Sequence, residues 1–368
     1  MNFDYNEEQQ LLADSVRRFL QKDYGFEERK KIVASKQGWS DKVWATMAQM
    51  GLTGLPFSTE QGGFGGGAVD LMGVMEAAGD ALLVEPYLAT LMGGRLVALA
   101  GSDAQKKAVL PGVVEGKSRL AFAHSEKGAR YNLAKVGAKA KKSASGWEIT
   151  GEKVVVVGVP AADKLVVSAN TDKGLSLFLV EKKALKIKPY VTLDEQGAGD
   201  VSLSNTPAEL LGAEGKALPA IEEVVDFATA LVCAEAVGAM KFACDTTLEY
   251  LKTRKQFGVP IGTFQALQHR MVDMYVSYEQ AKSMACLACS KADTHADAKD
   301  RARAISAAKI KIADNCRHIS QESIQLHGGM GMSEELKVSH TFRRLTMIAQ
   351  QFGDAEHHLA RFAMLDRA

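Results

Sequence analysis

The residues best suited to chemistry lie at a break between two helical patterns, within residues 247–265. The break carries Arg254, then Gln256 and Phe257, and a new helical pattern starts near Gln265. A guanidinium is always charged and offers a planar set of donors, and the N-terminus of a helix offers free N–H groups. The stretch therefore predicts a loop that binds a phosphate.

A second candidate segment is the glycine-rich run 325–331, which reads QLHGGMG and follows an amphipathic helical pattern. Its glycines allow backbone N–H groups to approach a ligand closely. Each segment alone also fits a purely structural role, because helix breaks commonly need glycine or proline and a Gly-Gly pair often ends a helix. The case for a ligand site rests on the two segments together.

The composition favours a folded protein of two or three domains. The chain has 368 residues, 46% of them hydrophobic and 24% charged, and a formal net charge of +1. This balance gives no electrostatic reason to expect nucleic acid or an anionic membrane as a partner. No long uninterrupted apolar stretch predicts a membrane-spanning helix, and the polar start MNFDYNEEQQ is unlike a secretory signal. We expect a cytoplasmic protein.

The period of the apolar residues changes twice along the chain. Helical spacing predicts an N-terminal α-helical domain over 1–115, and short apolar runs such as 154–157 predict a middle β domain over 116–215. Helical spacing then returns and predicts a C-terminal bundle over 216–368. The four helical runs expected there cover residues 221–254, 263–294, 297–327 and 334–367. The predicted fold class is α+β, with a β-barrel module between helical domains.

The two segments and this domain order resemble one family, the flavin-dependent acyl-CoA dehydrogenases, over essentially the whole chain. In that family the patterns R-x-x-F-G-x-x-I-x-x-F-Q and Q-x-x-G-G-x-G grip the ADP half of FAD held by a neighbouring subunit. The resemblance implies FAD as the cofactor and an acyl-CoA thioester as the substrate. The cofactor-binding residues that it implies are Arg254, Gln256, Phe257, Gln265, Gln325, Leu326, His327, Gly328, Gly329 and Ser125.

The family's reaction needs a carboxylate base to take the α-proton while a β-hydride passes to the flavin. Members carry the base at one of two positions, and this sequence departs at both. Gly353 takes the place of a Glu before the last helix, and Ala228-Thr229 replaces an early Glu-Arg pair. The carboxylates nearest the late position are Asp354 and Glu356, which are the candidate bases.

The segments that face the flavin ring in the family also differ here. The pattern K-x-W-I-T-N reads KVVVVG over 153–158, so valines replace an aromatic platform and a hydrogen-bond donor. The pattern T-E-P-x-A-G-S-D reads SEKGARYN over 125–132, where only Ser125 keeps a hydroxyl at the flavin-facing end. On this basis Val155→Ala and Gly353→Ala are expected to leave flavin binding unchanged.

This pattern resembles the small, base-poor subunits of two-gene acyl-CoA dehydrogenases, such as the pimeloyl-CoA and steroid side-chain types. It implies a heteromeric, α2β2 complex in which a homologous subunit supplies the base and the flavin platform, with electron-transfer flavoprotein as the acceptor. Two alternatives remain open. One is a self-sufficient homotetramer that uses Asp354 or Glu356 as its base, and the other is a non-catalytic scaffold or regulatory subunit.

No metal site is expected. Cys286 and Cys289 have redox or zinc spacing but no second pair, and the odd total of five cysteines favours buried, reduced thiols. The adjacent His357 and His358 diverge by about 100° on a helix, so one metal cannot easily take both. The basic run 139–142 is predicted to be a solvated hairpin tip, with a CoA phosphate contact as the alternative.

Overall fold

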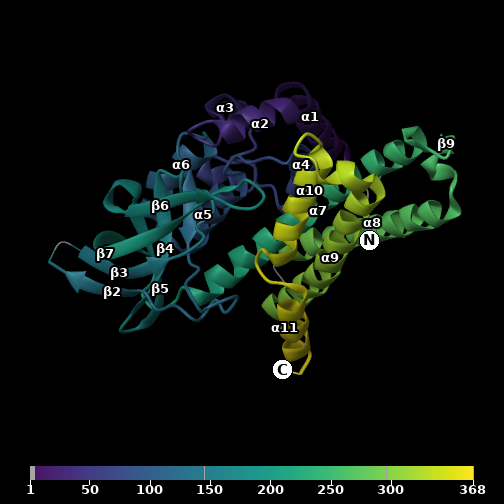
Figure 1. Cartoon of the computed structure of the whole chain (residues 1–368). Coiled ribbons are helices and arrows are strands. Elements are labelled where there is room, and N and C mark those ends of the chain that lie inside the picture. Colours follow the sequence, from purple (N-terminus) through teal and green to yellow (C-terminus); the bar gives the residue numbers. More distant parts are fainter. Residues whose placement is uncertain (1–4, 145, 295–296, 368) are drawn as a thin grey trace. The chain divides into compact units, whose positions relative to one another are not determined.

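A computed structural model describes residues 5–144, 146–294 and 297–367 (Figure 1). The chain forms two compact units, each assembled from separate stretches of sequence. The bundle unit consists of Met1–Arg29, Gly67–Leu83 and Thr229–Ala368, and the barrel unit consists of Lys30–Gly66 and Val84–Ala228. Secondary structure follows the predicted order, because helices run to Val114, strands lie between Leu120 and Leu211, and helices resume at Leu218.

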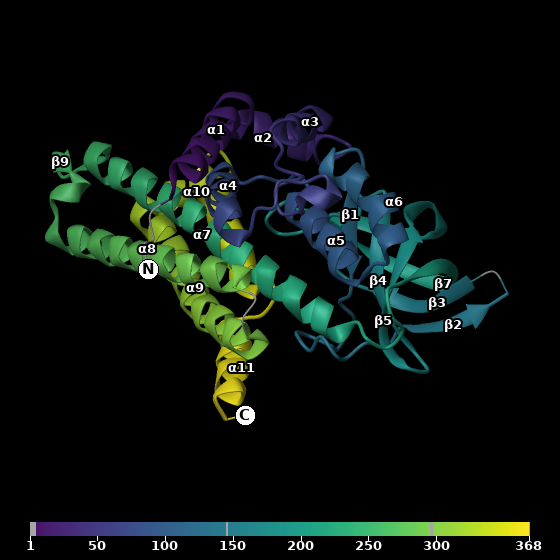
Figure 2. The same ribbon diagram turned by 180° about the vertical axis from the view of Figure 1, so that it is seen from behind.

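The bundle unit is built of long helices. They are α1 (Glu7–Asp23), α4 (Ala68–Ala81), most of α7 (Leu218–Thr253), α8 (Gln265–Asp293), α9 (Ala298–His327), α10 (Lys337–Gln350) and α11 (Ala355–Arg367). α8 and α9 lie side by side, and α10 and α11 also pack against α9 (Figures 1 and 2). Ile305, Ile312 and Ile319 are spaced by two helical turns and fully buried, so α9 carries a continuous apolar face into this core.

The prediction of the last of the four long helices is wrong in one respect. The run expected over 334–367 is two helices, α10 and α11, separated by a turn at 351–354. Phe352 has φ +61° and Gly353 has φ +128°, and neither angle is compatible with a right-handed helix. The helical spacing of apolar residues continues across the turn, which is why the sequence pattern hid the break.

Within the bundle unit, a side chain at the end of α8 caps the start of α4. The backbone N–H groups of Ala68 and Val69 donate to the carboxylate of Asp293, at 2.6 and 2.8 Å. The first N–H groups of a helix have no partner within the helix, so Asp293 at the end of α8 satisfies two of those of α4. Gly67 is required here, because a Cβ at that position would collide with the Asp293 carboxylate.

The barrel unit contains a mostly antiparallel sheet that closes on itself. Its strands are β1 (Leu120–Ala123), β2 (Lys139–Ser143), β3 (Gly146–Lys153), β4 (Lys164–Thr171), β5 (Gly174–Glu181), β6 (Lys186–Val191) and β7 (Gly197–Leu211). Pairing runs in a ring through β4, β2, β3, β7 and β5 and back to β4, with β1 beside β4 and β6 beside β7. Inward side chains including Ile149, Phe178 and Val201 fill the interior.

Helices complete this unit. They are α2 (Phe26–Ala34), which crosses the boundary between units, α3 (Asp41–Gln49), α5 (Tyr87–Ala100) and α6 (Asp103–Val114). Helical first and last parts with a β-barrel between them confirm the predicted fold class.

Two predictions within the barrel unit are corrected. The run 154–157 is not a strand, because β3 ends at Lys153 and Val155 adopts a left-handed conformation with φ +52°. The basic run 139–142 is not a hairpin tip, because it lies within β2 and pairs with β3 residues 147–150. Valine favours strands and lysine favours exposed tips, but both tendencies are weak beside tertiary pairing.

Helix α7 is long and apolar enough to cross a membrane by length and composition alone, yet 89% of its most apolar window is buried in the structure. This burial is expected of a core helix. All five cysteines are free and every one but Cys286 is buried. Among residues 5–144, 146–294 and 297–367, no group of His, Cys, Asp and Glu side chains could hold a metal ion.

Candidate cofactor site

The first predicted segment folds as a tight hairpin between α7 and α8. β8 (Lys255–Gln256) pairs with β9 (Val259–Pro260), and the two residues between them, Phe257 and Gly258, have φ of +54° and +81°. Two successive left-handed residues form the turn that suits a two-residue hairpin. Phe257 is 91% exposed, and its ring lies edge to face with that of Phe264, with ring centroids 6.1 Å apart. The hairpin thus projects an aromatic ring into solvent.

Arg254 stands at the base of this hairpin. Its backbone N–H donates to the Tyr250 carbonyl and its carbonyl accepts from the Ile261 N–H, both at 2.8 Å, which fixes the residue in place. Its side chain is exposed, and the guanidinium makes no hydrogen bond or ion pair with any residue that the structure describes. The arginine is therefore available to a ligand, instead of capping its helix or pairing with a surface carboxylate. Gln256 and Gln265 are likewise exposed.

The second predicted segment forms the end of α9 and a short 3₁₀ turn, η4 (Gly328–Met332). A Cβ added to Gly328 or Gly329 would meet nothing within 4 Å, so the backbone there borders open space. Gly328 has φ +58°, which suits the left-handed end of a helix. Gln325 is exposed as well, so its amide and the glycine backbone form the accessible part of the segment.

The other two members of this segment face inward. Leu326 and His327 are 5% and 3% exposed. The His327 Nδ1 lies 2.7 Å from the Ser323 carbonyl, to which it donates, and the ring stacks on Tyr250 with centroids 4.5 Å apart. Burial lowers the pKa of His327, which keeps the ring neutral. These side chains position the segment and are not themselves offered to a ligand.

The same contacts bring the two segments together at one end of the bundle unit. The Tyr250–His327 stack joins the end of α7 to the end of α9. The Arg270 Nε donates to the Glu322 carboxylate at 2.6 Å and joins the start of α8 to the end of α9. The guanidinium, the exposed amides and the open glycine backbone thus lie at the same end of the bundle unit, and together they form a donor set that suits a polyphosphate.

The turn before α11 is arranged in the opposite way. A Cβ at Gly353 would lie 2.5 Å from the His358 Nε2 and 2.6 Å from the His357 Cδ2. Asp354 accepts a hydrogen bond from the His357 N–H at 2.8 Å and caps α11, and Glu356 is exposed on the first turn of that helix. Gly353→Ala would therefore strain this turn. That it leaves flavin binding unchanged stays a prediction.

The early-helix position of the family's base is also closed. Ala228 and Thr229 are 0% and 1% exposed, so the position holds a methyl and a hydroxyl group packed in the protein interior. A carboxylate is missing from both places where the resemblance implies one.

In the barrel unit, the segment after β3 is fixed by its backbone. The Val154 N–H donates to the Ser125 carbonyl at 2.8 Å, and the Val155 N–H lies 3.1 Å from both the Tyr190 hydroxyl and the Asp200 carboxylate. Ser125 is exposed, and Val155 is 48% exposed. A β-branched residue with positive φ is strained, so these acceptors hold a conformation that the isolated segment would leave.

Sequence reasoning missed the buried charge network that supports this segment. Lys153 is fully buried, and its ammonium donates to Glu126 at 2.7 Å and to Ser168 at 3.0 Å. Glu126 in turn accepts from the N–H groups of Gly137 and Ala138. Burial lowers the pKa of Lys153 to about 8. The only signal in the sequence was a single lysine placed directly before four valines.

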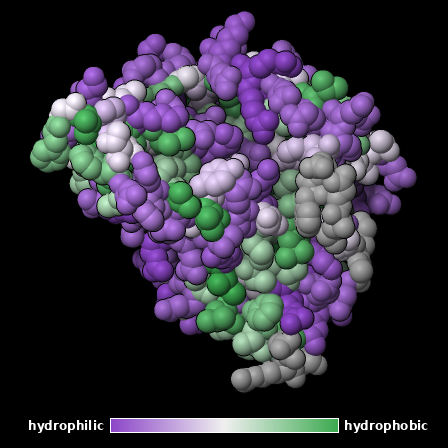
Figure 3. Space-filling model, turned by 90° about the vertical axis from the view of Figure 1, so that its right-hand side faces the viewer, coloured by the Kyte–Doolittle hydropathy of each residue, from purple (hydrophilic) through white to green (hydrophobic). Residues whose placement is uncertain are grey.

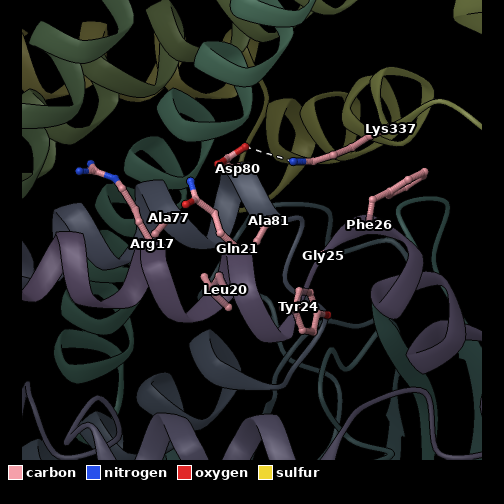
Figure 4. A pocket seen from close by; sticks show the side chains of 10 residues that line it. All are labelled: Arg17, Leu20, Gln21, Tyr24, Gly25, Phe26, Ala77, Asp80, Ala81 and Lys337. Carbon is pink, nitrogen blue, oxygen red and sulfur yellow. Dashed lines mark hydrogen bonds and ion pairs between the residues drawn. The ribbon is translucent and has the colours of Figure 1, made fainter.

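A pocket in the bundle unit lies away from the predicted residues. Lys337 lines it together with residues of α1, α4 and the turn at Gly25, and its ammonium donates to Asp80 at 3.1 Å (Figure 4). Lys337 pairs with Asp80, and Arg17, the other charged residue of the lining, pairs with Asp14 and Glu76, so the pocket gives no sign of chemistry.

Comparison with known proteins decides the family. The model for the acyl-CoA dehydrogenase N-terminal domain matches residues 6–117, and that for the C-terminal domain matches residues 218–364. The chain belongs to the acyl-CoA dehydrogenase family. It is 30% identical to "Acyl-CoA dehydrogenase FadE12" of Mycobacterium tuberculosis, over 95% of this chain and 93% of the relative. The predicted enzyme class, an oxidoreductase acting on the CH–CH bond of acyl-CoA, is confirmed.

Solved structures agree with this assignment. The chain is 29% identical to "Tcur3481-Tcur3483 steroid ACAD G363A variant", with a TM-score of 0.90 and 98% of each chain covered. It is 26% identical to "PigA with FAD and proline", with a TM-score of 0.90 over 99% of this chain and 98% of that one. The FAD that this acyl-CoA dehydrogenase fold implies is compatible with the donors at the end of the bundle unit, since a diphosphate requires accessible, unpaired donors.

Proposed function

We propose that this chain is the base-lacking subunit of a heteromeric acyl-CoA dehydrogenase and that it binds the ADP half of FAD held by a partner subunit. The observation that carries the proposal is the exposed guanidinium of Arg254, which has no partner among the residues that the structure describes, at the same end of the bundle unit as the open backbone of Gly328 and Gly329. The closed surroundings of Gly353 support the other half of the proposal, since a base cannot occupy that position without rearrangement.

Each residue of the site has a role in this proposal. Arg254 binds the diphosphate, the Gln256, Gln265 and Gln325 amides bind polar groups of the nucleotide, and Phe257 covers an apolar part of it. Leu326 and His327 hold the segment from below, and Gly328 and Gly329 give the backbone its close approach. Ser125 offers a hydroxyl toward a flavin. FAD, when bound, accepts the hydride that leaves the β-carbon of the substrate.

The partner in this proposal is a homologous acyl-CoA dehydrogenase subunit that supplies the base and the flavin platform. One related structure, the Tcur3481-Tcur3483 steroid enzyme, is named after two chains, which supports a two-chain assembly and a bulky acyl-CoA substrate. Electron-transfer flavoprotein is the proposed electron acceptor. We place the complex in the cytoplasm, in keeping with five free cysteines.

The bundle unit has an exposed apolar surface on which a partner subunit could pack. Val272, Tyr275 and Val276 on the outer side of α8 are 60%, 56% and 47% exposed. Apolar side chains are visible among hydrophilic ones on the face drawn in Figure 3. Neighbouring exposed apolar groups in a folded protein commonly mark an interface. We propose that the complex, a dimer or tetramer, assembles through the bundle unit.

Expression with and without the homologous subunit tests the proposal. Alone, the chain should purify without flavin and should not reduce an electron acceptor in the presence of acyl-CoA. With the subunit, the complex should bind FAD and gain acyl-CoA-dependent activity. Flavin and activity in the chain alone would favour a self-sufficient homotetramer. Flavin in the complex with no change in the partner's own activity would favour a scaffold or regulatory subunit.

A further inference from the structure

The turn between α10 and α11 is held from inside by a buried cation. Lys309 on α9 is 0% exposed, and its ammonium donates to the carbonyls of Ala349 at 3.2 Å and Gly353 at 2.7 Å. Ala349 lies in the last turn of α10, where unpaired carbonyls and the helix dipole favour a positive charge. Burial lowers the pKa of Lys309, so the protein spends free energy to keep this cation in its core.

A buried imidazole ring also holds this turn. His358 is 1% exposed, and its Nε2 lies 3.2 Å from the Phe352 carbonyl while its Nδ1 lies 3.3 Å from the Ser306 hydroxyl. A neutral ring that donates from Nε2 and accepts at Nδ1 satisfies both contacts. Ser306 precedes Lys309 by three residues, so one face of α9 provides both anchors.

These anchors determine which way the turn faces. Phe352 has φ +61°, a left-handed conformation that costs an aromatic residue about 1 kcal/mol or more. The carbonyls of Phe352 and Gly353 both point toward His358 and Lys309. The Cβ direction at Gly353 leads into the rings of His357 and His358. A side chain at position 353 would therefore meet the protein interior.

We infer that Lys309 and His358 are positioning residues that lock the 351–354 turn with its carbonyls inward, which excludes a base from position 353 of this subunit. The inference rests on the proposed function, because it explains why the partner subunit must provide the base. It does not depend on the flavin contacts of Arg254.

Hydrogen–deuterium exchange of the co-expressed complex tests this lock. The amides of Gln351, Gly353, His357 and His358 all make hydrogen bonds, so their exchange reports the turn. Lys309→Met keeps the aliphatic stem and removes the donors, and it should speed exchange at residues 351–358 at least tenfold while exchange in the barrel unit stays unchanged. Lys309→Arg, which restores a cationic donor, should recover part of the protection. Lys311→Met, on the same helix, is the matched control.

Other outcomes would overturn the inference. Unchanged exchange at 351–358 in Lys309→Met, an equal rise throughout the chain, or the same local rise in Lys311→Met would each show that Lys309 does not position the turn. If Lys309→Met does not fold, His358→Phe provides the second variant, because it fills the space without bonding the Phe352 carbonyl. It should give a smaller rise confined to the same residues, and no rise would count against the lock. FAD content of the same samples tests the proposed function separately.

Discussion

Two glycine-containing regions of the bundle unit show opposite designs. At the end of the bundle, Gly328 and Gly329 border open space, and the guanidinium of Arg254 has no partner within the part of the chain that the structure describes. At the turn before α11, Gly353 is packed against two imidazole rings and the carbonyls are bonded to buried donors. The first region leaves hydrogen-bonding capacity for another molecule, whereas the second uses its capacity internally.

The difference shows how a glycine should be interpreted. A glycine near exposed, unpaired donors allows a ligand to approach, and a glycine near buried rings allows the protein to pack on itself. Under the proposed function, this contrast separates the part that would contact the cofactor from the part that lacks a base. Four experiments test the contrast, beginning with the largest expected effect.

The two glycines should respond very differently to a methyl group. Gly353→Ala should lower the free energy of unfolding by about 2–4 kcal/mol, because the positive φ and the contact with His358 both oppose a Cβ. Gly329→Ala should stay within about 0.5 kcal/mol of the wild type, because its Cβ would meet nothing. Urea denaturation of both variants measures this. Equal losses would mean that the two sites do not differ as described.

The region of Arg254, Gly328 and Gly329 should determine the affinity for flavin. Arg254→Ala in the co-expressed complex should weaken FAD binding by about 1.5–3 kcal/mol, roughly one to two powers of ten, because a charge-assisted contact is lost. Arg254→Lys should recover only part, since an ammonium lacks the planar fork. Lys252→Ala is the control, because this lysine already pairs with Glu249. FAD retained after gel filtration is the measurement, and full retention in Arg254→Ala would contradict the proposed site.

The buried His358 at the 351–354 turn should make the stability of the protein sensitive to acid. Burial lowers the pKa of His358 to about 3. The unfolded chain takes up this proton below about pH 6.5 and the folded protein does not, so the unfolded state binds more protons between about pH 6.5 and pH 3. Stability should fall with decreasing pH across that window, by up to about 1.4 kcal/mol per pH unit from this residue.

Substitution separates this contribution from those of other groups. His358→Gln should reduce the slope of stability against pH, because it removes the ring that takes up its proton only in the unfolded state. Denaturation at several pH values between 4 and 7 would reveal the slopes. Equal slopes in His358→Gln and the wild type would show that the ring does not resist protonation.

The smallest effect is expected at the hairpin tip. Phe257 is 91% exposed, so Phe257→Ala should change the free energy of unfolding of the isolated chain by no more than about 0.5 kcal/mol. The same substitution should weaken FAD retention in the complex, because there the ring is proposed to cover an apolar part of the nucleotide. Thermal unfolding and flavin content, measured on matched samples, would separate the two effects. A clear loss of stability would indicate that the tip is structural.

Much of this protein is legible in the sequence because the signals are local. Helical spacing, the short apolar runs of the middle domain and the helix break at Phe257 and Gly258 are signals that depend on neighbours within a few positions. Arg254 and the run 325–331 could be selected because phosphate chemistry restricts the residue types that serve it. The replacement of the family's catalytic Glu by Gly353 was also visible, since it is a change of residue type.

Other features depended on contacts between distant residues, which periodicity cannot show. Continuous helical spacing hid the break at 351–354, because Lys309 on another helix and His358 stabilise two left-handed residues there. The inward orientation of His327 came from packing against Tyr250. The buried Lys153 network depends on partners up to 29 positions away. The sequence determined which groups are present, and the tertiary structure decided which were already satisfied, because only distant contacts can satisfy a donor or exclude a side chain.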